Sequence, residues 1–202
     1  MTQLVWYAAY GSNLSRSRFD CYLKGGRAEG AAREYEPSRD TSDPRSHRPW
    51  NLPGALVFGK ESLNWTGGGV AFLDTDSSEK ARGRLYLVTH AQFEDIVAQE
   101  NHRPVGDVTL PSIGAGYRSD LEQGFYPLVI VLGELDDYPI ATITDRLSEH
   151  RKPSPAYLRH VAQGLRESHH MSDYQIADYL SGRPGIVGAF DASELLSAVR
   201  LA

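Results

Sequence analysis

The segment that most constrains this chain is an apolar run that ends abruptly in turn-forming residues. Residues 4–10 read Leu-Val-Trp-Tyr-Ala-Ala-Tyr, and Gly11, Ser12 and Asn13 follow at once. An uninterrupted apolar run of this length predicts a strand buried on both faces, rather than one with alternating faces. The rest of the chain must therefore cover this strand, with a turn or a site at its carboxyl end.

Composition narrows the class of protein. A length of 202 residues suits one domain, and the net charge of -5 without any basic run argues against a nucleic-acid-binding surface. No apolar run approaches the ~18 residues of a membrane helix, and the first residues do not resemble a targeting segment. Cys21 is the single cysteine, so no internal disulfide or cysteine-based zinc site can form. We expect a soluble cytoplasmic protein that binds neither nucleic acid nor membranes.

Apolar patterning and capping residues predict the other elements. Thr89 with Gln92 is a capping box, and Ser154 before Pro155 marks another helix start. The predicted strands are 4–10, 54–59, 69–74, 82–88, 125–133 and 138–144, and the predicted helices are 15–24, 90–100 and three that follow Ser154, Ser172 and Asp191. This order predicts an α+β fold: a small, barrel-like mixed sheet with surrounding helices.

Two stretches lack such patterns. Residues 33–53 contain four prolines among many polar residues, and residues 102–123 contain two prolines and several glycines. Proline and glycine at this density predict long surface loops. We therefore predict one domain over residues 1–202, with long loops at 33–53 and 102–123.

The turn after the first strand is a candidate anion-binding loop. A strand that passes through Gly11, Ser12 and Asn13 into a helix leaves backbone N–H groups without partners in the chain. Glycine permits close approach by a ligand, and a helix N-terminus attracts negative charge. The alternative is an ordinary strand-to-helix turn, which composition alone favours.

A glutamate on an apolar helix face is the second candidate. Phe93, Ile96 and Val97 mark the core-facing stripe of the helix 90–100, and Glu100 falls on the same stripe. Desolvation there would raise its pKa and make it a better base near neutral pH. The alternative is that Glu100, in the last turn, curls out to water.

Together these residues resemble a known family. Tyr10-Gly11-Ser12-Asn13-Leu14 after a buried strand resembles the signature of the γ-glutamylcyclotransferase-like family, which includes plant avirulence-induced proteins. Other segments agree with the family in order and spacing: Trp65-Thr66-Gly67-Gly68, the helix ending at Glu100, Gly124-Phe125-Tyr126, and Pro153-Ser154-Pro155-x-Tyr157. Both long loops depart from the family pattern, as does Asn101-His102, where many members have glycine after the glutamate.

The resemblance implies a reaction and roles for residues. The family converts γ-glutamyl amines or amino acids into 5-oxoproline and the free amine, without metal or cofactor. It implies that Glu100 is the general acid and base, and that Tyr10, Gly11, Ser12, Asn13, Leu14 and Tyr126 bind a small γ-glutamyl substrate. It does not indicate the oligomeric state or the amine released.

Two other functions remain open on the sequence. A non-catalytic ligand-binding or regulatory module would keep the fold and pocket, although it has no use for a base on an apolar helix face. An enzyme acting on a γ-glutamylated specialised metabolite or protein side chain would differ in its pocket rim, which is where the two unusual loops are expected.

Overall fold

A six-stranded mixed sheet organises the molecule, for which a computed structural model describes residues 3–200. The strand order is β2-β5-β1-β8-β7-β6, and a separate ribbon contains β3 and β4. The strands are β1 Leu4–Ala9, β2 Ser46–Pro53, β3 Ala55–Ser62, β4 Gly68–Asp74, β5 Lys80–Thr89, β6 Arg118–Asp120, β7 Leu128–Leu135 and β8 Tyr138–Thr144. β1 pairs antiparallel with β5 and parallel with β8, which confirms the predicted α+β fold with a mixed sheet.

The sheet is open, so the predicted barrel-like closure is wrong. In the described part of the chain the sheet ends at β2 and at the three-residue strand β6. Neither edge closes the sheet, because β2 contains prolines that lack an N–H donor and β6 is very short. The β3–β4 ribbon instead joins the sheet through a side chain: Thr144 on β8 bonds to both the N–H and the carbonyl of Leu73, each at 2.9 Å.

The two predicted loops contain short strands. β2 falls within 33–53 and pairs with β5 along its whole length, so the last part of the predicted surface loop is an edge strand. Its Pro49 and Pro53 are tolerated because β2 is an edge strand and needs donors on one side only. β6 falls within 102–123 and pairs with β7.

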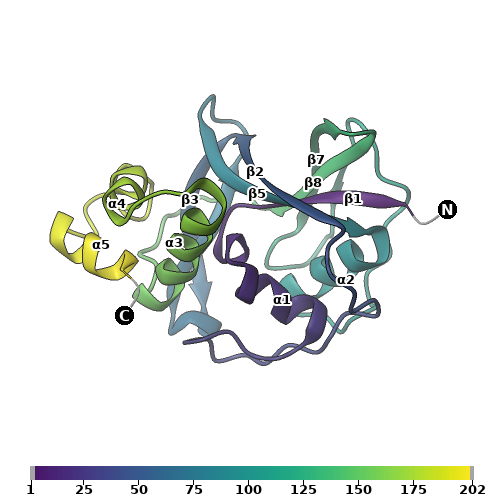
Figure 1. The fold of residues 1–202 in the computed structure, drawn as a ribbon, viewed down its shortest axis with the longest axis horizontal. Coiled ribbons are helices and arrows are strands. Elements are labelled where there is room, and N and C mark those ends of the chain that lie inside the picture. Colours follow the sequence, from purple (N-terminus) through teal and green to yellow (C-terminus); the bar gives the residue numbers. More distant parts are fainter. Residues whose placement is uncertain (1–2, 201–202) are drawn as a thin grey trace.

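Helix caps decide where the helices begin, as predicted. The helices are α1 Arg16–Lys24, α2 His90–Glu100, α3 Pro155–His169, α4 Asp173–Ser181 and α5 Ala192–Val199. Capping boxes open α2, α4 and α5, and the Ser154 side chain caps α3. Figure 1 shows α3, α4 and α5 grouped at one end of the molecule, away from α2.

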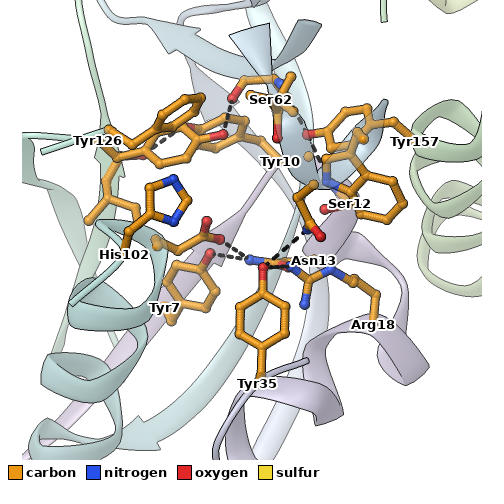
Figure 2. Close-up of a pocket in the computed structure, with 18 residues that line it drawn as sticks. Tyr7, Tyr10, Ser12, Asn13, Arg18, Tyr35, Ser62, His102, Tyr126 and Tyr157 are labelled. Atoms are coloured by element: carbon orange, nitrogen blue, oxygen red, sulfur yellow. Dashed lines mark hydrogen bonds between the residues drawn. The ribbon is translucent and has the colours of Figure 1, made fainter. Parts of the chain in front are cut away.

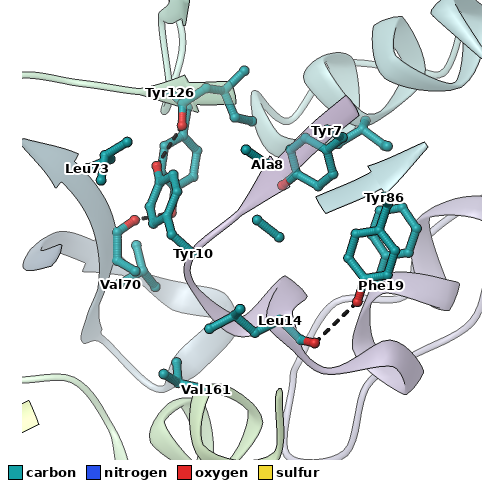
Figure 3. Close-up of a cluster of buried hydrophobic side chains, with 14 of the residues drawn as sticks. Tyr7, Ala8, Tyr10, Leu14, Phe19, Val70, Leu73, Tyr86, Tyr126 and Val161 are labelled. Atoms are coloured by element: carbon teal, nitrogen blue, oxygen red, sulfur yellow. Dashed lines mark hydrogen bonds between the residues drawn. The ribbon is translucent and has the colours of Figure 1, made fainter. Parts of the chain in front are cut away.

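β1 lies in the middle of the core. All six of its residues are buried, as its continuous apolar sequence predicts. Aromatic rings pack beside it: Phe19 of α1 stacks on Tyr86 of β5 with ring centroids 3.9 Å apart, and Tyr7 of β1 lies next to Phe19 (Figure 3). Residues 3–200 contain no helix with the length and apolar character that crossing a membrane requires.

Candidate functional site

The loop after β1 forms a short 3₁₀ turn, Ser12–Leu14, before α1 begins. Gly11 has a φ of −108°, so it is not in the left-handed region. Glycine is needed here because there is no room for a side chain. A Cβ on Gly11 would meet the Tyr157 hydroxyl oxygen at 2.6 Å and the Ala71 Cβ at 2.9 Å. Glycine here allows α3 and β4 to approach the loop closely.

The loop contributes to one wall of a pocket. The residues that line the pocket are Tyr7, Tyr10, Gly11, Ser12, Asn13, Arg18, Tyr35, Ser62, Asn64, Trp65, Val70, Ala71, Glu100, His102, Phe125, Tyr126, Ile143 and Tyr157 (Figure 2). The cavity among them is small, about 50 Å³, and it opens to solvent at its mouth.

Six of the seven residues predicted for the site lie together in this pocket. They are Tyr10, Gly11, Ser12, Asn13, Glu100 and Tyr126. Leu14 is the exception, because its fully buried side chain packs against α3 (Figure 3). A Cβ added to Gly164 of α3 would lie 2.2 Å from that of Leu14, so glycine is needed for this contact. The loop therefore has a pocket face and a core face.

Glu100 is the last residue of α2 and lies on the pocket wall. The apolar stripe of α2 is in the core, where Phe93, Ile96 and Val97 are fully buried, while Glu100 is half-buried. Its Oε1 accepts a hydrogen bond from Asn13 Nδ2 at 2.7 Å. Among residues 3–200 no group donates to its other oxygen. One oxygen is thus held by the protein, and the other is available to a ligand.

Asn13 connects Glu100 to the loop. Its Nδ2 donates to Glu100 and also to the Tyr7 hydroxyl at 2.9 Å. Its Oδ1 is buried and has no partner within the described residues. Buried polar atoms without partners are uncommon in folded proteins, so this oxygen is a second acceptor suited to a ligand.

Tyr157, on the opposite wall, has an unusual hydrogen-bond pattern. Its hydroxyl accepts the backbone N–H of Ala71 at 2.9 Å and that of Ser12 at 3.4 Å. Burial raises the pKa of Tyr157 to about 12, so the phenol keeps its proton at neutral pH. Because both bonds are accepted ones, that proton remains free for donation.

The two predicted tyrosines act as pocket walls. The Tyr10 hydroxyl donates to the carbonyl of Ile143 at 2.6 Å, and the Tyr126 hydroxyl donates to the carbonyl of Ala71 at 3.1 Å. Each donor is therefore already used within the protein. Their buried rings give the pocket its apolar sides.

Asn101 fixes Tyr126 beside Glu100. Its Oδ1 accepts the Tyr126 N–H at 2.8 Å, and its Nδ2 donates to the Tyr126 carbonyl at 3.1 Å. A Cβ on Gly124 would lie 2.2 Å from the same Oδ1. The departure from the family pattern at Asn101 thus connects the end of α2 to the segment just before β7.

Several polar residues of the pocket were not assigned a role from the sequence, among them Arg18, Tyr35 and His102. Arg18 is 2% exposed, and Tyr35 lies in the proline-rich stretch. His102 lies within 2.8 Å of Arg33, and burial lowers its pKa, with the charge of Arg33 as a second cause. The sequence did hold a signal that Arg18 is buried: it lies next to Phe19 and one helical turn before Tyr22, on a face of α1 that is otherwise apolar.

No set of three or more His, Cys, Asp or Glu residues that could hold a metal ion occurs in residues 3–200. The polar side chains that line the pocket include one carboxylate, one guanidinium, one imidazole, two amides, two serine hydroxyls and several phenols. This set can bind a small charged molecule and transfer a proton.

Comparison with known proteins supports the fold. No family model matches the chain. Histone deacetylase 5 of Arabidopsis thaliana is 33% identical over 198 residues, covering 87% of this chain. The match covers only 30% of that protein, so the likeness concerns less than a third of its length.

Two solved structures cover 98% of this chain and are themselves 98% covered. One is a gamma-glutamyl cyclotransferase, with a TM-score of 0.56 and 16% identity. The other is a crystal structure of an uncharacterized protein from Homo sapiens, with a TM-score of 0.57 and 18% identity. The predicted resemblance is confirmed at the level of the fold: this chain has the γ-glutamylcyclotransferase-like fold.

Proposed function

We propose that the chain is a γ-glutamylcyclotransferase-type enzyme. It cyclises a γ-glutamyl amino acid or amine to 5-oxoproline and releases the free amine, with Glu100 as general acid and base. The observation that carries this proposal is the Glu100 carboxylate, which Asn13 holds by one oxygen in a pocket while the other oxygen has no partner among the described residues.

The reaction needs a base because the attacking group is the substrate's own α-amine. That amine is protonated at neutral pH, and its ammonium form has no lone pair to attack with. Glu100 takes a proton from it, with Asn13 Oδ1 as a second acceptor for the remaining N–H bonds. The nitrogen then attacks the γ-carbonyl carbon and closes a five-membered lactam. Because the attack is intramolecular, binding the folded conformer supplies much of the rate.

Charge then develops on the γ-carbonyl oxygen. Tyr157 has a proton that no bond within the described residues uses, and we assign it the role of donor to this oxygen. Glu100 gives the accepted proton to the leaving nitrogen as its bond to the γ-carbon breaks. The ring nitrogen then loses its second proton through the same carboxylate to the released amine, which leaves as an ammonium ion. Every step uses side chains of this chain, so the proposed reaction needs no cofactor. A cytoplasmic location is a separate part of the proposal.

Two alternatives share the pocket. A non-catalytic binding module would use Asn13 and Glu100 as ligand contacts only. An enzyme for a γ-glutamylated protein side chain or specialised metabolite would carry out the same reaction on a larger substrate. The likeness to a histone deacetylase carries no proposal of deacetylation, because this chain matches less than a third of that protein.

The test compares two glutamates. Purified protein is incubated with a panel of γ-glutamyl amino acids and amines, and 5-oxoproline is measured. Glu100→Gln should lower turnover at least about 100-fold, because the amide cannot accept the proton. Glu167→Gln is the matched control. Glu167 binds Arg84 at 2.7 Å outside the pocket, so turnover should stay close to that of the unchanged protein.

Two outcomes would overturn the proposal. Equal turnover in Glu100→Gln removes Glu100 as the base. Absence of turnover across the whole panel, with binding of γ-glutamyl compounds retained, favours the non-catalytic module.

A further inference from the structure

Arg18 is a buried positive charge on the pocket wall without a negative partner. It is 2% exposed, and no carboxylate lies within ion-pair distance of it among residues 3–200. Its Nη2 donates to the hydroxyls of Tyr22 at 2.6 Å and Tyr35 at 2.9 Å. Its Nε and Nη1 are buried without any partner in the described residues.

Aromatic rings surround the guanidinium. The rings of Tyr22 and Tyr35 lie 4.4 Å and 4.5 Å from its central carbon, and Trp65 lies at 6.0 Å. Figure 2 shows the Arg18 guanidinium meeting the Tyr35 hydroxyl on the wall of the pocket. Ring faces and phenol oxygens offset part of the cost of burial, but they are neutral. A buried charge that keeps unused donors is costly unless something else supplies an acceptor.

Two other arginines among the described residues, the buried Arg84 and the exposed Arg39, have carboxylate acceptors. Arg84 is 5% exposed and pairs with Glu167 at 2.7 Å. Arg39 pairs with both Glu94 and Asp95 at 3.0 Å or less. Arg18 differs from both in the two donors it leaves unused and in lying on the wall of a pocket. The missing acceptor is therefore best supplied by a ligand.

A carboxylate fits Arg18 better than other acceptors do. Nη2 already donates to Tyr22 and Tyr35, so a carboxylate oxygen would accept a single hydrogen bond from Nη1 or Nε, and such a bond between opposite charges is stronger than one to a neutral acceptor. In the proposed reaction the substrate is a zwitterion, with the α-ammonium and the α-carboxylate on the same carbon atom. The pocket has opposite charges to offer, Glu100 for the ammonium and Arg18 for the carboxylate.

We propose that Arg18 binds the α-carboxylate of the γ-glutamyl unit and thereby selects substrates that have this free carboxylate. This rests on the proposed function for the identity of the ligand. Arg18 is then a binding and positioning residue: by holding the carboxylate it fixes the rotation of the α-carbon and directs the amine toward Glu100.

The test measures binding of the product, so it does not depend on turnover. 5-Oxoproline keeps the α-carboxylate, 5-oxoprolinamide replaces it by a neutral amide, and pyrrolidin-2-one lacks it. Calorimetric titration of the unchanged protein should show 5-oxoproline binding at least about tenfold more tightly than either neutral lactam, since a charged pair replaces unused donors. Arg18→Met should abolish this preference and bring the three affinities together.

Two variants control for structure. Arg84→Met removes the other buried guanidinium and should keep the preference for 5-oxoproline. Arg18→Lys keeps the positive charge and should retain part of the preference, which a purely structural Arg18 would not. If Arg18→Met does not fold, as judged by circular dichroism, the unchanged protein and Arg18→Lys still decide the matter. Equal binding of the three lactams by the unchanged protein would overturn the proposal.

A second arm separates the two carboxylates of a γ-glutamyl amino acid. Turnover of γ-glutamylalanine is compared with that of γ-glutamylethylamine, which has no carboxylate on the released amine. We expect Arg18→Met to slow both to a similar extent. If it slows only γ-glutamylalanine, Arg18 binds the released part instead and the assignment is wrong. If no γ-glutamyl compound is turned over but 5-oxoproline still binds in an Arg18-dependent way, the proposed reaction is wrong and the assignment of Arg18 as a carboxylate-binding residue is retained.

Discussion

A buried arginine lies on each face of the loop after β1, and the two arginines differ in their hydrogen-bond and ion-pair partners. On the core face, Arg84 donates to the Leu14 carbonyl at 3.0 Å and pairs with Glu167. On the pocket face, Arg18 has phenol oxygens and aromatic rings but no carboxylate. The same short loop therefore separates a charge that is neutralised within the fold from one that is not.

This difference distinguishes stability from binding. A paired buried charge contributes to the fold, and its loss leaves a partner unsatisfied. A buried charge that lacks a partner weakens the fold and persists where it serves something else. Burial opposes the charge on Arg18, yet its pKa lies above the ordinary value because the oxygens of Tyr22, Tyr35 and Glu100 favour the charged form. The pocket face thus keeps Arg18 charged without pairing it with a carboxylate.

The largest effect on stability is expected at the core face. In Gly164→Ala the new Cβ would lie 2.2 Å from the Leu14 carbonyl carbon and 2.4 Å from the Ser15 nitrogen, so α3 must shift. We expect the free energy of unfolding to fall by about 3 kcal/mol, which corresponds to a melting temperature about 6–12 °C lower. Urea and thermal unfolding measure this.

The comparison on the pocket face is Gly11→Ala. Its new Cβ meets the Tyr157 hydroxyl oxygen at 2.6 Å and the Ala71 Cβ at 2.9 Å, which are side-chain atoms, whereas Gly164→Ala also meets backbone atoms at 2.2 Å and 2.4 Å. Stability should fall less than in Gly164→Ala, while turnover of γ-glutamyl substrates falls more. If the two variants lose stability equally, the division of the loop into two faces is wrong.

The sequence predicts what depends on local rules. The caps at Thr89, Ser154 and Asp191 set helix starts because their hydrogen bonds reach only three residues along the chain. The helical period brought Glu100 to the correct side of α2, since Phe93 and Ile96 fix the core face. Rules of this kind need no knowledge of the neighbouring elements.

What the sequence did not predict depends on contacts between distant segments. β2 forms from proline-rich sequence because an edge position beside β5 makes those prolines harmless. Arginine in a helix is ordinarily solvated. Arg18 is buried because Tyr35, 17 residues away, folds over it. Leu14 belongs to a recognisable motif yet faces the core, since only the position of α3 decides which face of the loop each residue occupies.

A medium effect on stability should distinguish the two arginines directly. Arg84→Met leaves Glu167 without its cation and weakens the bonding of the Leu14 carbonyl, which keeps the Tyr86 hydroxyl at 3.2 Å. Because Glu167 is partly exposed and can be rehydrated, we expect a loss of about 2 kcal/mol rather than the larger cost of a fully buried pair. Arg18→Met exchanges an unpaired charge for an apolar side chain of similar length, so stability should change by less than about 1 kcal/mol.

Chemical denaturation of both variants at neutral pH measures the difference. Without ligand, Arg18→Met should unfold at a higher urea concentration than Arg84→Met. The reverse order would mean that the aromatic contacts of Arg18 stabilise the fold more than the ion pair of Arg84, and the comparison between the faces would fail.

The smallest effect concerns pH at the core face. His47 Nδ1 lies 3.4 Å from Arg84 Nη2; burial lowers the pKa of His47, and the charge of Arg84 is the second cause. The unfolded chain therefore binds a proton more readily than the folded one. Above the ordinary histidine pKa of about 6.5 this contribution to stability is fully present, and it is lost as the pH falls through the lower pKa of the folded state.

The contribution of His47 can be isolated by substitution. His47→Gln should reduce the loss of stability between pH 7.5 and pH 5.5 by no more than a few tenths of a kcal/mol, because His47 is exposed and solvent screens its interactions. The same substitution in the Arg84→Met background should have a smaller effect on this pH dependence, since one of the causes of the shift is gone. In the Arg18→Met background it should have its full effect, because Arg18 is not among the charges acting on His47. An effect of His47→Gln that is independent of Arg84 would show that burial alone controls this histidine.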